Sequence, residues 1–210
     1  IAKLPGVAQP AGANATFVIP DTIEGWSDAL GILLSSYFVS DQPFPEYAGK
    51  IVHFDYTLIR PKGRPISSGM GRAPGPEPLR RSLEVIRTLL DKRIAEGHAR
   101  MRSIDAYDIL MHASDAVLSG GVRRSATICL FSPDDDLMAT AKTGNWFTEN
   151  PQRARSNNSA ILLRDQTTRA QFAKLMKSVK EFGEPGFVWT DNVDMTFNPC
   201  GEIGLYPQID

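Results

Sequence analysis

Residues 159–189 have the sequence SAILLRDQTTRAQFAKLMKSVKEFGEPGFVW, and this stretch decides the class of fold. Its two ends, Ser159–Leu163 and Gly186–Trp189, are short apolar runs typical of strands, and Asp165–Phe182 between them has the periodicity of a helix. The apolar residues on one face of that helix are Phe172, Leu175, Met176 and Val179. A strand, a long helix and a second strand in succession predict an α/β fold with parallel strands.

The alternation continues upstream. We expect strands at Lys50–Tyr56 and Ser125–Phe131, and helices at Ile23–Ser36 and Ile104–Leu118. A further helix begins at Leu79, and the apolar residues along its face are Leu79, Leu83, Ile86, Leu90 and Ile94. These elements extend the α/β pattern over most of the chain.

The start of the first helix carries polar signals. Asp21 precedes it and is the residue that we expect to cap its free amides, and Glu24 stands in the first turn, where the helix dipole favours an acid. Residues 1–20 are rich in Pro, Gly and Ala, which predicts a linker or an extended surface segment.

The composition excludes some function classes. The chain has 210 residues, of which 42% are hydrophobic and 22% charged, so it can bury a substantial core. Its net charge is −1, which gives no electrostatic reason to expect nucleic acid or an acidic membrane as a partner. Local basic clusters in a neutral chain fit small anionic ligands or simply solvated faces.

The cysteines and apolar runs point to a reducing, aqueous environment. Cys129 and Cys200 are the only two cysteines, too few for a disulfide framework and not in the spacing of a zinc site. The longest apolar run, Ala29–Val39, is shorter than a membrane helix, and residues 1–20 lack the pattern of a signal peptide. We therefore expect a cytoplasmic protein, with Cys129 packed in a core strand.

Residues 58–78 form a long segment rich in Pro and Gly, unsuited to a helix or a central strand. A loop of this length within a compact domain is usually functional or disordered. Its scattered Arg, Lys and Ser residues favour contact with anions.

The segment Asn198–Ile203, NPCGEI, places a thiol between a carboxamide and a carboxylate. In an extended loop, side chains two residues apart point the same way, so Asn198, Cys200 and Glu202 can converge on one ligand. A neighbouring carboxylate disfavours the thiolate that cysteine nucleophiles need, which leaves one-electron chemistry of the neutral S–H. The residues alone leave a second interpretation open, a turn with a packed cysteine.

The NPCGEI segment resembles the finger-loop motif of ribonucleotide reductases. Further segments resemble those of the cobalamin-dependent, monomer-type reductases, in the same order along the chain. They are Pro20–Trp26, Arg60–Gly69, Ala73–Pro76, Gly121–Ala126, Ser156–Ser159 and Gly183–Gly186. The chain is thereby identified as a member of the ribonucleotide reductase family, as an internal piece of the large subunit.

The resemblance implies roles for the loop residues. Cys200 would become a transient thiyl radical that abstracts the 3′ hydrogen of the ribose, Glu202 would take the proton of the 3′ hydroxyl, and Asn198 would hold the substrate hydroxyls. Adenosylcobalamin would generate the radical, and the reaction would make 2′-deoxyribonucleotides for DNA synthesis.

The resemblance also implies an architecture. The chain would form part of a ten-stranded α/β barrel with the finger loop at its centre. Residues 1–20 would be the linker, residues 21–78 the effector and specificity region, and residues 79–210 the part of the catalytic barrel that ends just after the finger loop.

Two nucleotide sites follow from the same resemblance. A deoxynucleotide effector would be recognised by residues at the first helix and in the Gly/Pro loop, namely Asp21, Arg60, Lys62, Gly63, Arg64, Ser67 and Ser68. The ribonucleoside triphosphate substrate would contact Ser156, Asn157, Asn158 and Arg124. The polar run from Ser156 to Ser159, expected as a loop entering a strand, could equally satisfy its own backbone.

The expected reductant is a thioredoxin-like dithiol. In this family each turnover oxidises a pair of cysteines, and the chain has no cysteine before Cys129 or after Cys200 to form that pair. We therefore expect this chain alone to be inactive.

Three alternatives compete with this assignment. The first is a class I reductase whose radical comes from a separate metal-containing subunit. The second is a non-catalytic nucleotide-binding regulator. The third is a cysteine hydrolase in which His53, His98 or His112 activates Cys200.

Overall fold

The computed structural model describes residues 4–66, 71–118, 126–201 and 203–205. The chain forms two compact units, Ile1–Arg124 and Ser125–Asp210. None of the helices in these described ranges has both the length and the apolar character needed to cross a bilayer.

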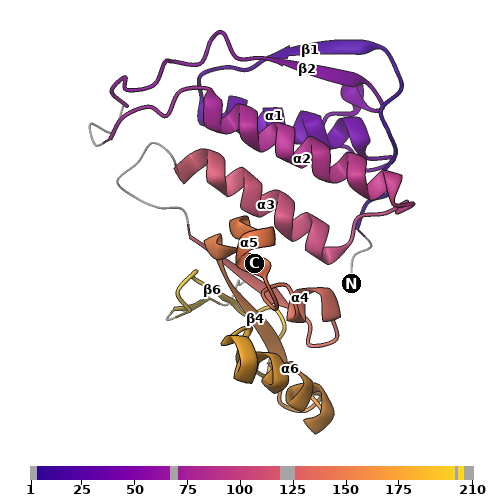
Figure 1. The fold of residues 1–210 in the computed structure, drawn as a ribbon, viewed down its shortest axis with the longest axis vertical. Coiled ribbons are helices and arrows are strands. Elements are labelled where there is room, and N and C mark those ends of the chain that lie inside the picture. Colours follow the sequence, from indigo (N-terminus) through magenta and orange to yellow (C-terminus); the bar gives the residue numbers. More distant parts are fainter. Residues whose placement is uncertain (1–3, 67–70, 119–125, 202, 206–210) are drawn as a thin grey trace, which may run out of the picture. The chain divides into compact units, whose positions relative to one another are not determined.

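The first unit contains a βαβ arrangement followed by two long helices (Figure 1). Strand β1 (Asn14–Val18) pairs in parallel with β2 (Ile51–Asp55) across helix α1 (Ile23–Tyr37) and the short 3₁₀ helix η1 (Pro45–Tyr47). Helix α2 (Glu77–Ala95) packs against α1 and along α3 (Ser103–Leu118). The predicted apolar face of α2 is confirmed, because Leu79, Leu83, Ile86 and Leu90 are all buried.

Strand β1 lies within the segment that we expected to be a linker or an extended surface segment. Its five residues match Ile51–Asp55 one by one, so residues 14–18 belong to a sheet and are not a free linker. Composition concealed this strand because Pro and Gly surround the short run Ala15–Val18, whose alternating burial becomes visible only in the pairing. The functional division of the chain at residues 20 and 78 stays a prediction.

The N-terminal cap of α1 is Thr22, not Asp21. The Thr22 hydroxyl oxygen accepts a hydrogen bond from the Gly25 amide at 2.9 Å, whereas the Asp21 carboxylate is used in an ion pair described below. Glu24 lies in the first turn as predicted. The sequence could not discriminate between the two residues, since Asp and Thr are both good caps.

Gly25 is where α1 meets the preceding chain. An added Cβ would lie 2.5 Å from the Pro20 carbonyl oxygen and 2.8 Å from Pro20 Cδ, closer than side chains ever approach. Residues in the run from Pro20 to Gly25 therefore have local structural roles: Thr22 caps the helix, and Gly25 lets Pro20 pack on it.

We predict that Gly25→Ala lowers the free energy of unfolding by about 1–3 kcal/mol, the usual cost of overpacking. The sign is opposite to that of most Gly→Ala changes within helices, which gain helix propensity. Ser27→Ala, at an exposed position of the same helix, is the matched control and should stay within about 0.5 kcal/mol. Urea unfolding checks both, and a stabilising effect of Gly25→Ala would contradict the close approach.

The second unit is built on a three-stranded parallel sheet. Strands β3 (Thr127–Phe131), β4 (Ser156–Leu163) and β5 (Gly186–Thr190) lie in that order, with β4 in the centre. The elements between them are helices α4 (Asp136–Ala139) and α5 (Trp146–Glu149), the 3₁₀ helix η2 (Pro151–Arg155) and helix α6 (Arg169–Phe182). A hairpin of β6 (Thr196–Phe197) and β7 (Gly204–Leu205) follows.

The quoted strand–helix–strand segment is confirmed, with shifted boundaries. Helix α6 begins at Arg169 instead of Asp165, because Thr168 and Gln171 form a reciprocal capping box. The ring of Phe172 packs on those of Phe187 and Trp189 with centroids 5.3 and 5.5 Å apart, which joins the helix to β5.

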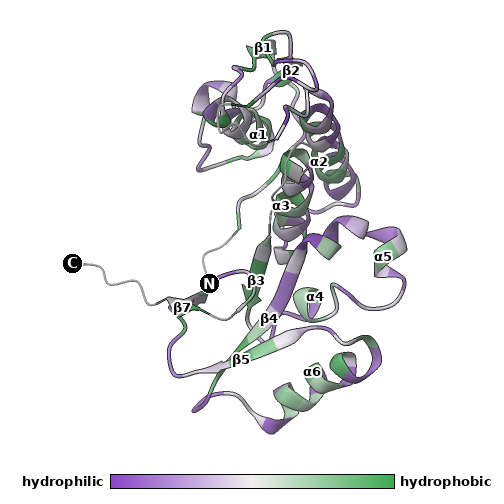
Figure 2. Ribbon diagram, turned by 90° about the vertical axis from the view of Figure 1, so that its left-hand side faces the viewer, coloured by the Kyte–Doolittle hydropathy of each residue, from purple (hydrophilic) through white to green (hydrophobic). Residues whose placement is uncertain are grey.

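Strand β4 begins three residues earlier than predicted. Residues 156–158, expected as a polar loop, are strand residues paired with Thr127, Ile128 and Cys129 of β3. Ser156 and Asn158 are buried and Asn157 is exposed, which is the alternation of a strand made with polar residues. Figure 2 shows this hydrophilic start of β4 beside the hydrophobic β3. Within the described residues the parallel strands form open sheets and no closed barrel.

Candidate functional site

The predicted catalytic loop is the tip of the β6–β7 hairpin. The amide of Gly201 donates to the Asn198 carbonyl at 2.8 Å, and the amide of Asn198 donates to the Ile203 carbonyl at 3.1 Å. Gly201 has a φ of 83°, a conformation that a residue with a side chain rarely adopts. These constraints hold Cys200 at the end of the hairpin, where it is exposed.

Asn198 closes the loop with its side chain as well. Its Oδ1 accepts a hydrogen bond from the amide of Ile203 at 2.8 Å. The carboxamide is thus fixed beside Cys200 by a bond that uses only its oxygen. Glu202, the third predicted catalytic residue, lies outside the described residues.

A residue of strand β4 is hydrogen-bonded to the predicted catalytic loop. Asn157 Nδ2 donates to the carbonyl oxygen of Pro199 at 2.7 Å, across 42 positions of sequence. The structure therefore brings Asn157, predicted for substrate binding, next to the residue that precedes Cys200.

The remaining predicted substrate residues lie differently. Ser156 and Asn158 are buried on the opposite face of β4, where the Ser156 hydroxyl donates to Asn158 Oδ1 at 2.7 Å. Arg124 lies outside the described residues. A substrate role for these residues stays a prediction, and Asn157 is the one with a described hydrogen bond to the predicted catalytic loop.

The two cysteines have different surroundings. Cys129 is half-buried in β3. Burial raises the pKa of the Cys129 thiol to about 11, and the charge of Asp135 adds to this while Lys142 acts against it. The Cys129 thiol therefore stays neutral at physiological pH, as a packed strand residue would.

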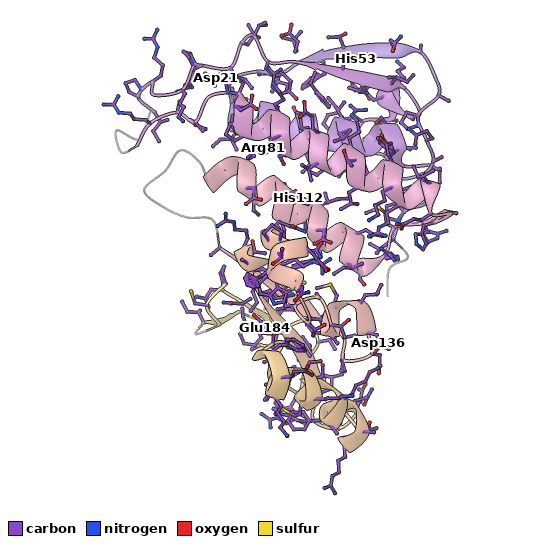
Figure 3. All side chains as sticks on the ribbon, viewed as in Figure 1. Asp21, His53, Arg81, His112, Asp136 and Glu184 are labelled. Atoms are coloured by element: carbon purple, nitrogen blue, oxygen red, sulfur yellow. The ribbon has the colours of Figure 1, made fainter. Side chains whose placement is uncertain are left out.

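Two of the predicted effector residues, Asp21 and Arg60, are in contact in the first unit at the start of α1. Arg60 Nε lies 2.5 Å from Asp21 Oδ2 in a partly exposed ion pair that links the Gly/Pro loop to the helix. Asp21 is marked in Figure 3, just before the start of α1. Two residues 39 positions apart, both predicted from the resemblance, are thus in direct contact.

The Gly/Pro loop is closed at its base. The amide of Gly63 donates to the Ala73 carbonyl at 2.9 Å, and the amide of Ala73 donates to the Arg64 carbonyl at 2.7 Å. Arg72 Nη1 adds a bond to the Gly63 carbonyl at 3.0 Å. Lys62 and Arg64 lie in this closed base, while Ser67 and Ser68 are outside the described residues.

Gly75 is a loop residue that the sequence did not single out for a role. It has a φ of 78°, and an added Cβ would meet the backbone nitrogen of Lys62 at 3.0 Å. Gly75 therefore lets the end of the loop pack against its beginning.

A buried lysine was also missed. The side chain of Lys142 is 5% exposed, and its Nζ lies 3.0 Å from Glu184 Oε1 and 2.5 Å from the carbonyl oxygen of Ser156. Glu184, marked in Figure 3, stands just before β5. The only sequence signal was that Glu184 falls in the Gly183–Gly186 landmark; nothing marked Lys142 as its partner.

The histidines needed by a cysteine hydrolase lie in the first unit, and residues 125–210 contain none. His53 is bonded to Asn14 Oδ1 at 3.1 Å, and His98 lies 3.8 Å from Glu96. The compact unit that carries Cys200 therefore supplies no imidazole base of its own.

Comparison with known proteins agrees with these observations. Residues 7–90 match the family described as "B12-dependent ribonucleotide reductase, insertion domain". The chain is 33% identical over 182 residues to the probable adenosylcobalamin-dependent ribonucleoside-triphosphate reductase of Dictyostelium discoideum, covering 84% of this chain and 22% of that protein. It is 31% identical over 205 residues to the adenosylcobalamin-dependent ribonucleoside-triphosphate reductase of Lactobacillus leichmannii, covering 89% of this chain and 26% of that protein.

A solved structure gives the same result. The crystal structure of a B12-dependent (class II) ribonucleotide reductase matches 92% of this chain with a TM-score of 0.74 and 28% sequence identity. The match covers 27% of that protein, so this chain spans only a fraction of its length. The chain belongs to the family of B12-dependent, class II ribonucleotide reductases.

Proposed function

We propose that the protein containing this chain reduces ribonucleotides to 2′-deoxyribonucleotides by thiyl-radical chemistry at Cys200. The observation that carries the proposal is the hairpin tip, where an exposed thiol is fixed beside the carboxamide of Asn198. A hydrogen-atom transfer needs an accessible S–H at a defined position, and this loop supplies one.

The chemistry assigns a step to each loop residue. The Cys200 thiyl radical takes the 3′ hydrogen atom of the ribose, Glu202 accepts the proton of the 3′ hydroxyl, and Asn198 orients the substrate hydroxyls. The 2′ hydroxyl leaves as water, a dithiol is oxidised to a disulfide, and the 3′ hydrogen returns from Cys200. In total, one ribonucleotide and one dithiol give one deoxyribonucleotide, one disulfide and one water.

The cofactor of this proposal is adenosylcobalamin, on which the named relatives depend. When bound, it supplies a radical through homolysis of its cobalt–carbon bond. The exposed Cys200 fits this chemistry, because its thiol is open to hydrogen-atom abstraction. The chain's own part is to hold that thiol at a defined position in the hairpin tip.

The proposed substrate is a ribonucleoside triphosphate, the substrate that the relatives' names state. The reductant is a thioredoxin-like dithiol, and the free thiols of Cys129 and Cys200 are consistent with a cytoplasmic enzyme. The parallel sheet β3–β4–β5 would be a part of the ten-stranded barrel, with the hairpin tip at its centre.

The first unit would read a deoxynucleotide effector. The Asp21–Arg60 pair links helix α1 to the closed base of the loop, so a ligand that changes this pair also biases the loop. An effector can shift the loop only by its differential affinity for the loop's conformations. Arg60, Lys62 and Arg64 supply donors for phosphates or base edges.

We predict that Arg60→Ala reduces the effector-dependent change in substrate preference by about tenfold, within the usual range of allosteric coupling. Arg164→Ala is the matched control, because Arg164 forms an exposed ion pair with Asp191 in the second unit. The ratio of two competing substrates reduced, with and without a deoxynucleoside triphosphate, measures the effect. An unchanged effector response in Arg60→Ala would contradict the assignment.

The proposed function is tested with the full-length protein, ribonucleoside triphosphates and a dithiol, with and without adenosylcobalamin. Reduction that requires the cofactor supports the proposal. Reduction without it would move the protein to the class that uses a separate radical-generating subunit. Nucleotide binding without reduction under any of these conditions would favour a non-catalytic regulator.

A further inference from the structure

Lys142 is a buried cation with three partners. Its ammonium group contacts the Glu184 carboxylate at 3.0 Å and the Ser156 carbonyl oxygen at 2.5 Å, and it lies 5.5 Å from the centre of the Trp146 ring. Lysine is almost never buried unless it is paired, because removing its charge from water is costly. We therefore expect the buried ammonium group to hold the segments that it contacts in fixed positions.

The ammonium binds β4 where the neighbouring strand is not yet present. The pairing of β4 with β5 begins only at Ser159 and Gly186. Ser156 lies before that point, and Glu184 lies just before the first residue of β5. Lys142 therefore joins the start of β4 to the chain that leads into β5, beyond the end of their ladder.

The carbonyl that Lys142 binds belongs to the peptide group that joins Ser156 to Asn157. Its orientation sets the direction of the Asn157 side chain, which leaves the strand on the opposite face. The Ser156 hydroxyl donates a hydrogen bond to Asn158 Oδ1 at 2.7 Å, across the intervening Asn157. The backbone at Asn157 is thus restrained by the Lys142 bond to the Ser156 carbonyl and by the contact between its two neighbours.

Asn157 passes this restraint to the catalytic loop. Its Nδ2 donates a hydrogen bond to the Pro199 carbonyl at 2.7 Å, and Pro199 directly precedes Cys200 in the chain. We infer that Lys142 and Glu184 are positioning residues for Cys200, acting through the Ser156–Asn157 peptide group and the Asn157 side chain. The inference rests on the proposed function and adds to it two residues, outside the loop of Cys200, that fix the position of the radical thiol.

The test uses turnover of the full-length reductase with adenosylcobalamin, a ribonucleoside triphosphate and a dithiol. Lys142→Met removes the charge and keeps the side-chain length, and Asn157→Ala removes the bond to Pro199. Each should lower kcat about 10- to 100-fold, the usual effect of losing a group that orients a reactive one. For Lys142→Met, KM for the nucleotide should change much less, because Lys142 is buried and its contacts are with Ser156, Glu184 and Trp146.

The double variant Lys142→Met/Asn157→Ala distinguishes positioning from general stability. If Lys142 acts through Asn157, the double variant should have a kcat no lower than that of the worse single variant. Lys174→Met, which breaks an exposed pair with Asp136 in the same unit, is the control and should leave kcat unchanged. If Lys142→Met does not fold, Glu184→Gln takes its place, because Glu184 is less buried. This variant should also lower kcat, but by a smaller factor.

Two results would overturn the inference. One is a wild-type kcat for folded Lys142→Met or Glu184→Gln, with only the melting temperature lowered. The other is fully multiplicative loss of kcat in the double variant, which would show that Lys142 and Asn157 act independently. Both are read against an active wild type, whereas an inactive wild type, or an active Cys200→Ala variant, would instead refute the proposed function.

Discussion

Cys200→Ala should abolish the proposed ribonucleotide reduction by the full-length protein, with kcat falling by about 10⁴-fold or more. Losses of this size are expected when the group that attacks the substrate is deleted, because nothing else in the site can replace it. The fold should tolerate the change, since Cys200 is exposed at the hairpin tip and the described hydrogen bonds of the loop are made by Asn198, Pro199, Gly201 and Ile203.

Cys129→Ala is the matched control for that variant. Cys129 is half-buried in β3, so its truncation should cost on the order of 1 kcal/mol in unfolding free energy and leave kcat within about twofold. Product formation over hours, with each variant's folded fraction measured beside it, separates the two effects. A Cys200→Ala variant that retained a tenth of the wild-type rate would be incompatible with a thiyl radical at Cys200.

Asp105→Ala should give the largest loss of stability among single changes in the first unit. Its side chain is 1% exposed and lies 2.7 Å from Arg93 Nε and 2.9 Å from Arg102 Nη2, so it ties the end of α2 to the start of α3. Deleting it leaves Arg102 without this carboxylate and Arg93 with Glu96 as its remaining described partner. Because both guanidinium groups are partly exposed, we expect a cost of about 3 kcal/mol, the lower end for a broken buried pair. Asp136→Ala, in the exposed pair with Lys174, should cost less than about 1 kcal/mol.

The same carboxylate makes stability depend on acid. Burial alone would raise the pKa of Asp105, but hydrogen bonds from Arg102 and the charge of Arg93 outweigh it, and the pKa lies below its ordinary value of 3.8. Because the pKa is lowered in the folded state, the carboxylate stabilises the fold at pH values above the ordinary pKa. That stabilisation is lost as the pH falls through the folded-state pKa. Urea unfolding of wild type and Asp105→Asn should therefore differ most near neutral pH and converge in strong acid. A difference that stayed constant down to strong acid would contradict this assignment.

Helices with long apolar faces could be predicted from sequence. The spacing of Leu79, Leu83, Ile86 and Leu90 identified α2, because periodic burial is a property of the element itself. Helix α6 was found in the same way, and only its start was misplaced. The residues before it form a turn in which the Thr167 amide donates to the Leu163 carbonyl at 2.8 Å, and the helix begins after its cap, Thr168.

Short strands with polar residues could not be predicted in this way. Asn14–Val18 and Ser156–Asn158 have weak strand signals of their own, and both depend on pairing with residues more than 25 positions away. The sequence likewise indicated an acidic cap at Asp21, but Arg60 binds that carboxylate and Thr22 becomes the cap.

The sequence predicted the local part of the candidate site and not its long-range contacts. Asn198 and Cys200 lie in one loop, as the hexapeptide predicted, and their catalytic roles stay predictions. The bond from Asn157 to Pro199 and the pair of Lys142 with Glu184 each span 42 positions. Such contacts follow from how the strands are ordered in the sheet, which no periodicity reveals.

The most direct measurement is electron paramagnetic resonance of the full-length protein with adenosylcobalamin and a ribonucleoside triphosphate. A radical on a cysteine sulfur has a spectrum that depends on the hydrogens of its own Cβ. The account predicts a substrate-dependent signal that changes when cysteine is deuterated at Cβ, disappears in Cys200→Ala and persists in Cys129→Ala. The same signal in Cys200→Ala, or a signal insensitive to cysteine deuteration, would contradict the assignment of the radical to Cys200.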